Sequence, residues 1–151
     1  MTHDHAGIYF FGLPPSTIQI AALAEGAEVA TENHGKKISF TWPDVTLTIT
    51  INTHWNRQVQ LDGIRGWLSR FPEEERTAPV VLQFLAGIDQ TTTCYGSKIT
   101  PAYDHGGKVS RLLKSLLADS GGFFFSHQSF YNAQSKRIVG LPGDPDALGA
   151  K

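Results

Sequence analysis

The chain has one cysteine, Cys94, and its chemistry depends on what lies beside it. Cysteine attacks as a thiolate, so a base such as His105 or His127 would have to come within reach and lower the pKa of the thiol. No Cys-x-x-Cys or Gly-x-Ser-x-Gly motif is present in the sequence. Because free cysteine is among the most often buried residue types, the sequence favours a packed strand residue over a nucleophile.

Metal ligands would have to come from the six histidines and the acidic residues. His3 and His5 flank Asp4, and the other histidines are scattered singly. No His-x-x-x-His or Cys-x-x-Cys pair presents two ligands on one face. Glu73, Glu74 and Glu75 read as a solvated charge run. We therefore expect no metal, no cofactor and no catalytic acid–base pair.

The segment 104–108 combines an acid, a histidine, two glycines and a lysine just before a predicted helix. Amides at a helix start, together with Lys108, can bind phosphate or carboxylate. The phosphate-binding P-loop pattern is incomplete, because Val109 replaces its Ser or Thr. Asp104 capping the helix is the structural alternative. A small-molecule or anion site, with or without catalysis, would use Asp104, His105 and Lys108, with His127 and Cys94 nearby.

His54-Trp55-Asn56-Arg57 follows a long strand directly, where binding loops are common. Trp and Arg are also the residue types enriched at the energetic centres of protein interfaces. The structural alternative is a Trp that closes a sheet edge, an Asn56 helix cap and an Arg57 in solvent. We take His54, Trp55 and Arg57 as candidate contacts for a partner protein.

The segment Ile8-Tyr9-Phe10-Phe11-Gly12-Leu13-Pro14-Pro15 resembles the first strand of an RNA-recognition motif. In that family an aromatic residue of this strand stacks on a base, so the resemblance implies RNA binding through a sheet surface. The family's second signature, Lys/Arg-Gly-Phe-Gly-Phe-Val, is missing from the later strands at 37–42 and 45–51. With a net charge of −1, nucleic acid is the least favoured partner.

Hydrophobic periodicity places these residues on strands and helices. A strand over 7–13 is apolar on both faces and therefore central in a sheet. A helix starts at a Ser16 cap, and period-two alternation predicts a hairpin over 38–51. A helix over 57–71 contains Gly63 and Gly66, each of which costs up to about 1 kcal/mol in a helix. We expect something to approach that helix face closely.

The second half reads helix, strand, helix, strand and strand. The helix at 79–86 could also be a buried strand, and strands follow at 91–100, 122–126 and 137–140 around a helix at 107–118. Both halves read β-α-β-β, which indicates a pseudo-repeat. We predict an α+β fold, with a mixed or antiparallel sheet and helices on one face. Residues 1–140 form the domain and 141–151 a flexible tail.

Composition bounds the class of protein. The chain has 151 residues, of which 40% are hydrophobic and 18% are charged, so it can build a core. No apolar run reaches the roughly 20 residues that span a bilayer, and a single cysteine suits the reducing cytoplasm. We expect a cytoplasmic interaction module, such as an inhibitor or immunity protein, that binds another protein and has no catalysis of its own. The sequence does not fix its oligomeric state.

Overall fold

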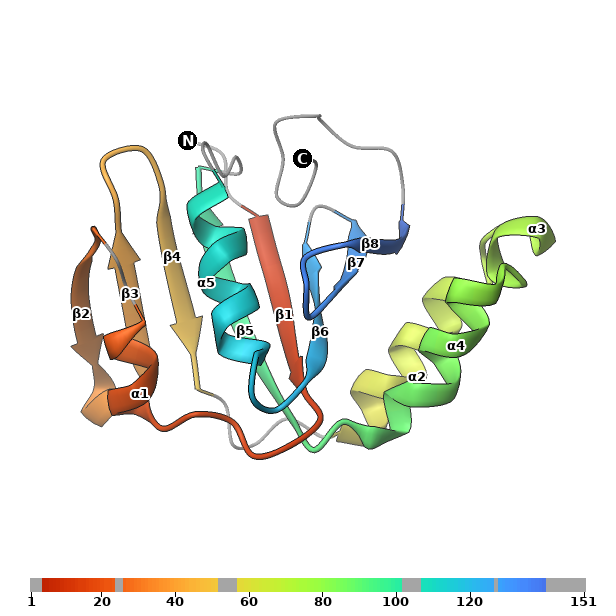
Figure 1. Ribbon diagram of the computed structural model, residues 1–151, viewed down its shortest axis with the longest axis horizontal. Helices are drawn as coiled ribbons and strands as arrows, with labels where there is room; N and C mark the ends of the chain where they lie inside the picture. The colour runs from red at the N-terminus through yellow and green to blue at the C-terminus, as the bar shows by residue number, and fades with distance from the viewer. Residues whose placement is uncertain (1–3, 24–25, 52–56, 102–106, 127, 141–151) are drawn as a thin grey trace.

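The computed structural model describes residues 4–23, 26–51, 57–101, 107–126 and 128–140. Eight strands form a single antiparallel sheet, which α-helices accompany (Figure 1), and this confirms the predicted α+β class. The elements are β1 (Asp4–Phe10), α1 (Thr17–Ala22), β2 (Glu28–Glu32), η1 (Asn33–Gly35), β3 (Lys37–Thr41), β4 (Thr46–Thr50), α2 (Arg57–Leu68), α3 (Glu73–Arg76), α4 (Pro79–Gly87), η2 (Ile88–Gln90), β5 (Thr93–Thr100), α5 (Lys108–Leu117), β6 (Gly122–Ser126), β7 (Ser129–Asn132) and β8 (Arg137–Gly140).

The first strand of the chain lies in the middle of the sheet. The strand order is β2-β3-β4-β5-β1-β6-β7-β8, and β1 pairs with β5 on one side and β6 on the other. Ile8 and Phe10 are fully buried on one face of β1, and Tyr9 is buried on the other. The prediction of a central strand that is apolar on both faces is confirmed.

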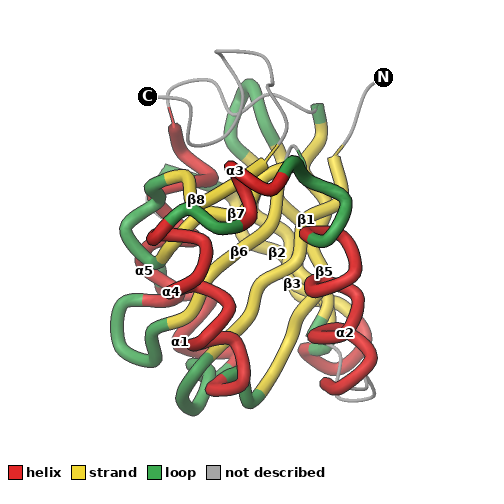
Figure 2. The backbone as a smooth tube through the Cα atoms, turned by 90° about the vertical axis from the view of Figure 1, so that its right-hand side faces the viewer, coloured by secondary structure: helices red, strands yellow, loops and turns green. Residues whose placement is uncertain are grey.

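Helices lie on both faces of the sheet, whereas the sequence predicted one face. The α1 and α5 helices pack with Ile8 and Phe10, and α2 and α4 pack with Tyr9 on the opposite face. In Figure 2, α5 and α2 lie on opposite sides of the strands. The physical reason lies in β1 and β6. Both strands carry apolar side chains at consecutive positions, so each of their faces has to be covered. Phe123 and Phe124 show this on β6, because they belong to different cores.

The core under α5 follows the predicted periodicity. The helix buries an apolar stripe against the sheet and leaves its cationic residues toward solvent. Beside it, α1 begins at Ser16, whose hydroxyl accepts from the Gln19 backbone amide while the Gln19 side chain accepts from the Ser16 amide. This reciprocal capping box confirms the predicted helix start. The stripe consists of Val109, Leu112, Leu113, Leu116 and Leu117.

The core under α2 and α4 is built largely from aromatic rings. Phe123 is edge-on to Phe84 at 4.9 Å, and Trp67 is edge-on to Phe130 at 5.5 Å. Edge-to-face contacts of this kind add to the apolar area that the rings bury. No residue of β2, β3 or β4 belongs to this core. On that face β3 and β4 carry polar side chains, such as Ser39 and Thr48, whose hydroxyls lie 3.2 Å apart.

The structure also bears on the predicted pseudo-repeat and on the segment 79–87. When α2, α3 and α4 are left aside, the strands and α-helices repeat the order β-α-β-β-β, but the strand order in the sheet does not repeat, so the pseudo-repeat is not confirmed. Segment 79–87 is a helix, not a strand. The predicted tail, 141–151, lies outside the described residues, and all eight strands between 4 and 140 belong to one sheet. Within the described chain, no helix is long and apolar enough to span a bilayer.

Candidate functional site

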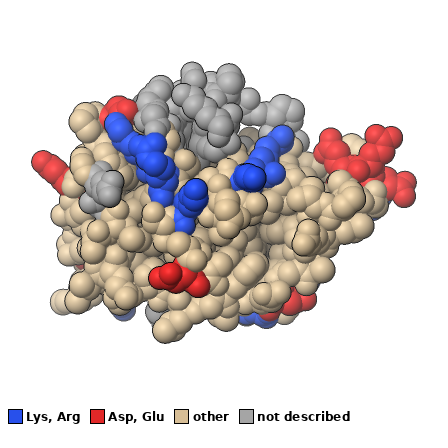
Figure 3. Space-filling view, viewed as in Figure 1, with Lys and Arg blue, Asp and Glu red and all other residues tan. Residues whose placement is uncertain are grey.

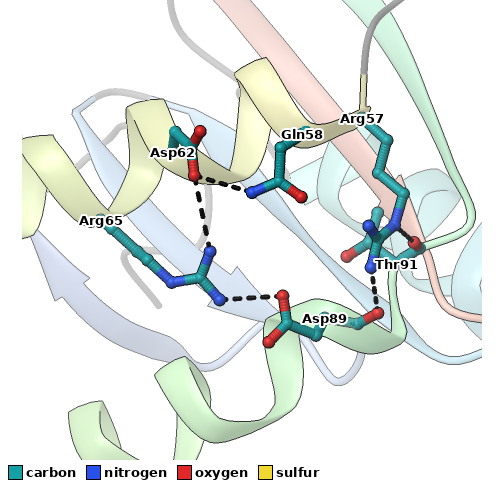
Figure 4. A network of polar contacts seen from close by, with 6 residues as sticks. All are labelled: Arg57, Gln58, Asp62, Arg65, Asp89 and Thr91. Carbon is teal, nitrogen blue, oxygen red and sulfur yellow. Dashed lines mark hydrogen bonds and ion pairs between the residues drawn. The ribbon is translucent and has the colours of Figure 1, made fainter.

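Of the three predicted contact residues, the structure describes Arg57 alone, because positions 54 and 55 fall in the undescribed segment 52–56. Arg57 opens α2, and its guanidinium is engaged within the protein. Nε donates to the carbonyl of Thr91 and Nη2 donates to the carbonyl of Asp89 (Figure 4). Arg57 therefore ties the start of α2 to the segment that leads into β5.

The same side of α2 continues as a polar network along η2. Arg65 lies 2.8 Å from Asp89 and 3.8 Å from Asp62, and Gln58 donates to Asp62 at 2.8 Å (Figure 4). These side chains are well exposed, so each pair stabilises the fold by only about 0–1 kcal/mol. Their effect is orientation: the polar side of α2 faces η2, and the opposite side of the helix is turned away from it.

On that opposite side, an aromatic pocket of about 190 Å³ opens between α2 and the sheet. The Trp67 ring forms one wall, edge-on to Phe125 and Phe130 at 5.5 Å each. Three of its lining residues, Tyr9, Gln60 and Trp67, have a polar group in the side chain. We call this cavity the α2 pocket, and its lining residues are Tyr9, Val59, Gln60, Gly63, Ile64, Trp67, Phe125 and Phe130.

Tyr9 lines the α2 pocket from β1 and is largely buried. The residue is 7% exposed and stacks on Phe123 with ring centroids 4.5 Å apart. Its hydroxyl extends over Gly7, where a Cβ would lie 3.0 Å from the phenol oxygen, so a side chain at position 7 would require the tyrosine ring to shift slightly. Burial, with a smaller effect from Cys94, raises the pKa of Tyr9 to about 12.

The α2 pocket is open on the side of Gly63 and Gly66. Nothing lies within 4 Å of a Cβ placed on Gly63 or on Gly66, and Val59, one turn before Gly63, is 61% exposed. The close approach expected at these glycines is therefore not made by any described residue of this chain. The helix backbone is open at this side to an outside surface.

Cys94 lies next to Tyr9 across the β1–β5 pair and is buried. Burial raises the pKa of the Cys94 thiol to about 11, and Arg57 offsets part of that effect. The thiol is thus protonated near neutral pH, which does not suit a nucleophile. The histidines proposed as its base, His105 and His127, lie outside the described residues.

Lys108, the described residue of the predicted anion site, does not lie beside Cys94. Lys108 begins α5, which packs on the face of the sheet opposite to Cys94. Its Nζ lies 2.5 Å from Oδ1 of Asp44 in the turn between β3 and β4. Asp104 and His105 fall in the undescribed segment 102–106. Lys108 and Cys94 therefore do not belong to a single site.

Two further expectations concern RNA and metals. The β1 rings that resemble the RNA-recognition motif, Tyr9 and Phe10, are buried under helices on both faces and do not form an exposed stacking surface. Among the described residues, no three His, Cys, Asp or Glu side chains gather as metal ligands do.

Comparison with protein-family models, with curated proteins and with solved structures found no match for this chain. The candidate site is therefore defined by its own geometry. Tyr9, Gln60 and Trp67 were not predicted as parts of a shared site, because they meet only through the packing of α2 on β1. The one signal in the sequence was the pair Gly63 and Gly66 within a helix.

Proposed function

We propose that the protein is a binding module that presents the open side of α2 to another protein. The observation that carries this proposal is the α2 pocket, an open space with aromatic walls on the exposed side of α2. An apolar side chain inserted there would be removed from water and would pack against aromatic rings. Interfaces commonly concentrate their binding energy in such desolvated pockets.

The size of the α2 pocket supports a protein side chain as its occupant. Its volume of about 190 Å³ lies below the roughly 300–1,000 Å³ of typical small-molecule sites. One large apolar side chain on a partner would suffice to occupy such a space. The lining favours an apolar anchor. Such an anchor would pack against Trp67 and Phe130.

The glycines support a protein surface at the rim. A helix gives up as much as about 1 kcal/mol of stability for each glycine in its interior. At Gly63 that loss has no compensating contact within the described chain. A partner backbone that packs directly over Gly63, with Val59 beside it, would supply the contact. The same reasoning extends the interface along α2 toward Gly66.

The kind of partner follows by analogy of fold class alone. Small α+β domains of near-neutral charge often act by covering a surface of another protein, such as an enzyme or a toxin. An inhibitor- or immunity-type role in the cytoplasm is therefore part of this proposal. In it, Arg57 positions the start of α2. His54 and Trp55, which precede it in the sequence and lie outside the described residues, are further candidate contacts.

Site-specific photocross-linking tests the interface. A benzoylphenylalanine placed at Val59 should capture a partner protein in the producing cells, and one placed at Leu82 should not. Leu82 is a matched control because it is an apolar residue of α4 that is 51% exposed. Equal capture from both positions, or from neither, would contradict the proposal.

A blocking variant makes the test specific to the pocket. Gly63→Leu places a side chain over the pocket mouth, where nothing in the described chain opposes it. The captured partner should be lost in this variant while the melting temperature is kept. Gln83→Leu, which adds the same side chain to an exposed position of α4, should leave capture unchanged.

A further inference from the structure

A second and larger cavity lies on the other face of the sheet, away from the α2 pocket. It has a volume of about 430 Å³, within the range of small-molecule sites. Its walls are α5, the end of α1 and the turn between β3 and β4. That turn is closed by the Trp42 amide, which donates to the Val45 carbonyl at 2.9 Å. We call this cavity the α5 cavity.

One wall of the α5 cavity is cationic. Lys108 and Arg111 lie three residues apart on α5, so they project from the same side of the helix. They are the two charged side chains among the described residues that line it. Ser115 lines the cavity one turn further along, and its hydroxyl donates to the Arg111 carbonyl at 3.0 Å. Figure 3 shows Lys and Arg side chains gathered on the face of the molecule where α5 lies.

The other wall is apolar. Trp42 and Pro43 of the β3–β4 turn line it, and Trp42 stacks on Phe40 with ring centroids 6.3 Å apart. Leu112 adds an apolar side chain from α5. A cavity with cations on one side and apolar groups on the other suits an organic acid. Its anionic group would pair with the cations, and its apolar body would be buried from water by packing against the apolar wall.

The ion pair with Asp44 limits how strongly Lys108 can bind another anion. The two charges form an ion pair, with Nζ 2.5 Å from Oδ1, at the turn that also carries Trp42. An incoming anion has to compete with this carboxylate for the ammonium. Arg111 is the more exposed of the two cations and also has an interaction partner, so an incoming anion has to compete for both charges.

We infer that the α5 cavity is a binding site for a small organic anion, a carboxylate on an apolar planar body. Arg111 and Lys108 hold the carboxylate, and the body packs against Trp42 and Leu112. This site does not depend on the proposed interface at α2, because the sheet separates the two.

The test is calorimetric titration of the full chain with 2-naphthoate as the probe, with 2-naphthamide and inorganic phosphate as comparison probes. We expect 2-naphthoate to bind and both comparison probes to bind more weakly, because one lacks the charge and the other lacks the apolar body. No binding of 2-naphthoate, or equal binding of either comparison probe, overturns the inference.

Variants assign the binding to the cavity. Arg111→Gln removes a charge-assisted hydrogen bond and should weaken 2-naphthoate binding about tenfold or more. Asp44→Asn frees Lys108 and should strengthen it. Lys136→Gln is the matched control, because it removes an exposed cation that does not line the cavity. An equal loss in Lys136→Gln would mean diffuse attraction to positive charge, and would overturn the inference.

Folding is checked by the melting temperature of each variant. Should Arg111→Gln fail to fold, Ser115→Trp gives an independent measurement, because it narrows the cavity from the exposed side of α5. Binding that survives in a folded Ser115→Trp protein places the anion elsewhere and overturns the inference. Gly63→Leu, which blocks the α2 pocket, should bind 2-naphthoate as the wild type does.

Discussion

Tyr9 and Cys94 are cross-strand neighbours whose neutral forms are favoured by burial. Burial raises the pKa of Tyr9 to about 12 and that of Cys94 to about 11. In the unfolded chain both groups ionise at lower pH. Their contribution to stability is therefore fully present at neutral pH and is lost as the pH rises from the unfolded pKa toward the folded one.

We predict an alkaline loss of stability that can be assigned to Tyr9. Between pH 10 and 12 the Tyr9 phenol stays protonated in the folded state and ionises in the unfolded state, so the free energy of unfolding falls by about 1.4 kcal/mol per pH unit for this group. Urea unfolding of the wild type and of Tyr9→Phe at several pH values measures it. The variant should lose less stability than the wild type, and parallel curves would refute this assignment.

The interior glycines of α2 lead to a prediction about the stability of that helix. Gly63 and Gly66 lie in its interior, with open space where a Cβ would be. Gly63→Ala and Gly66→Ala should each raise the free energy of unfolding, by up to about 1 kcal/mol, because alanine is the better helix former. Thermal and urea unfolding measure the change. A loss of stability in either variant would mean that another part of the chain occupies this space.

Most elements could be predicted because their side chains follow a period. Ile38, Phe40 and Ser39 alternate as a half-buried strand requires, and the structure places a strand there. The strand β2 was missed because all of its residues are exposed and its only pairing is to the backbone of β3. The strand β7 was missed because Phe130 and Tyr131 are buried at consecutive positions and show no alternation.

The candidate sites were less predictable than the elements. The α2 pocket joins Tyr9 of β1, Trp67 of α2 and Phe130 of β7, which are far apart in sequence. No local motif could reveal such a meeting. Lys108 was predicted as a binding residue, and the structure places it in the wall of a cavity. Trp42, which lines the same cavity, comes from a hairpin turn 66 positions earlier in the chain.

At the scale of the whole molecule, two cores share one sheet. Phe123 and Phe124 are neighbours on β6 but belong to different cores, with Trp67 packed against one and Trp42 within the other. Because both cores depend on the same strands, we expect them to unfold together. Phe123→Ala should cost about 3–5 kcal/mol and destabilise both faces equally.

Single-tryptophan proteins can measure this coupling. A chain that keeps Trp42 reports on the core of α1 and α5, and one that keeps Trp67 reports on the core of α2 and α4. In both backgrounds Phe123→Ala should lower the urea midpoint of fluorescence by the same amount, since a two-state domain has one transition. A shift confined to the Trp67 protein would show that the two cores unfold separately.

The central place of β1 has a consequence for synthesis on the ribosome. The strands β2, β3 and β4 can pair with one another as soon as they emerge, but both neighbours of β1 belong to the second half of the chain. Until Thr93–Thr100 has been made, the nascent polypeptide carries a strand that is apolar on both faces and has neither edge paired. Such segments are prone to aggregate during translation. Chaperone binding to the growing chain should therefore begin early and end only after β5 and β6 have left the exit tunnel.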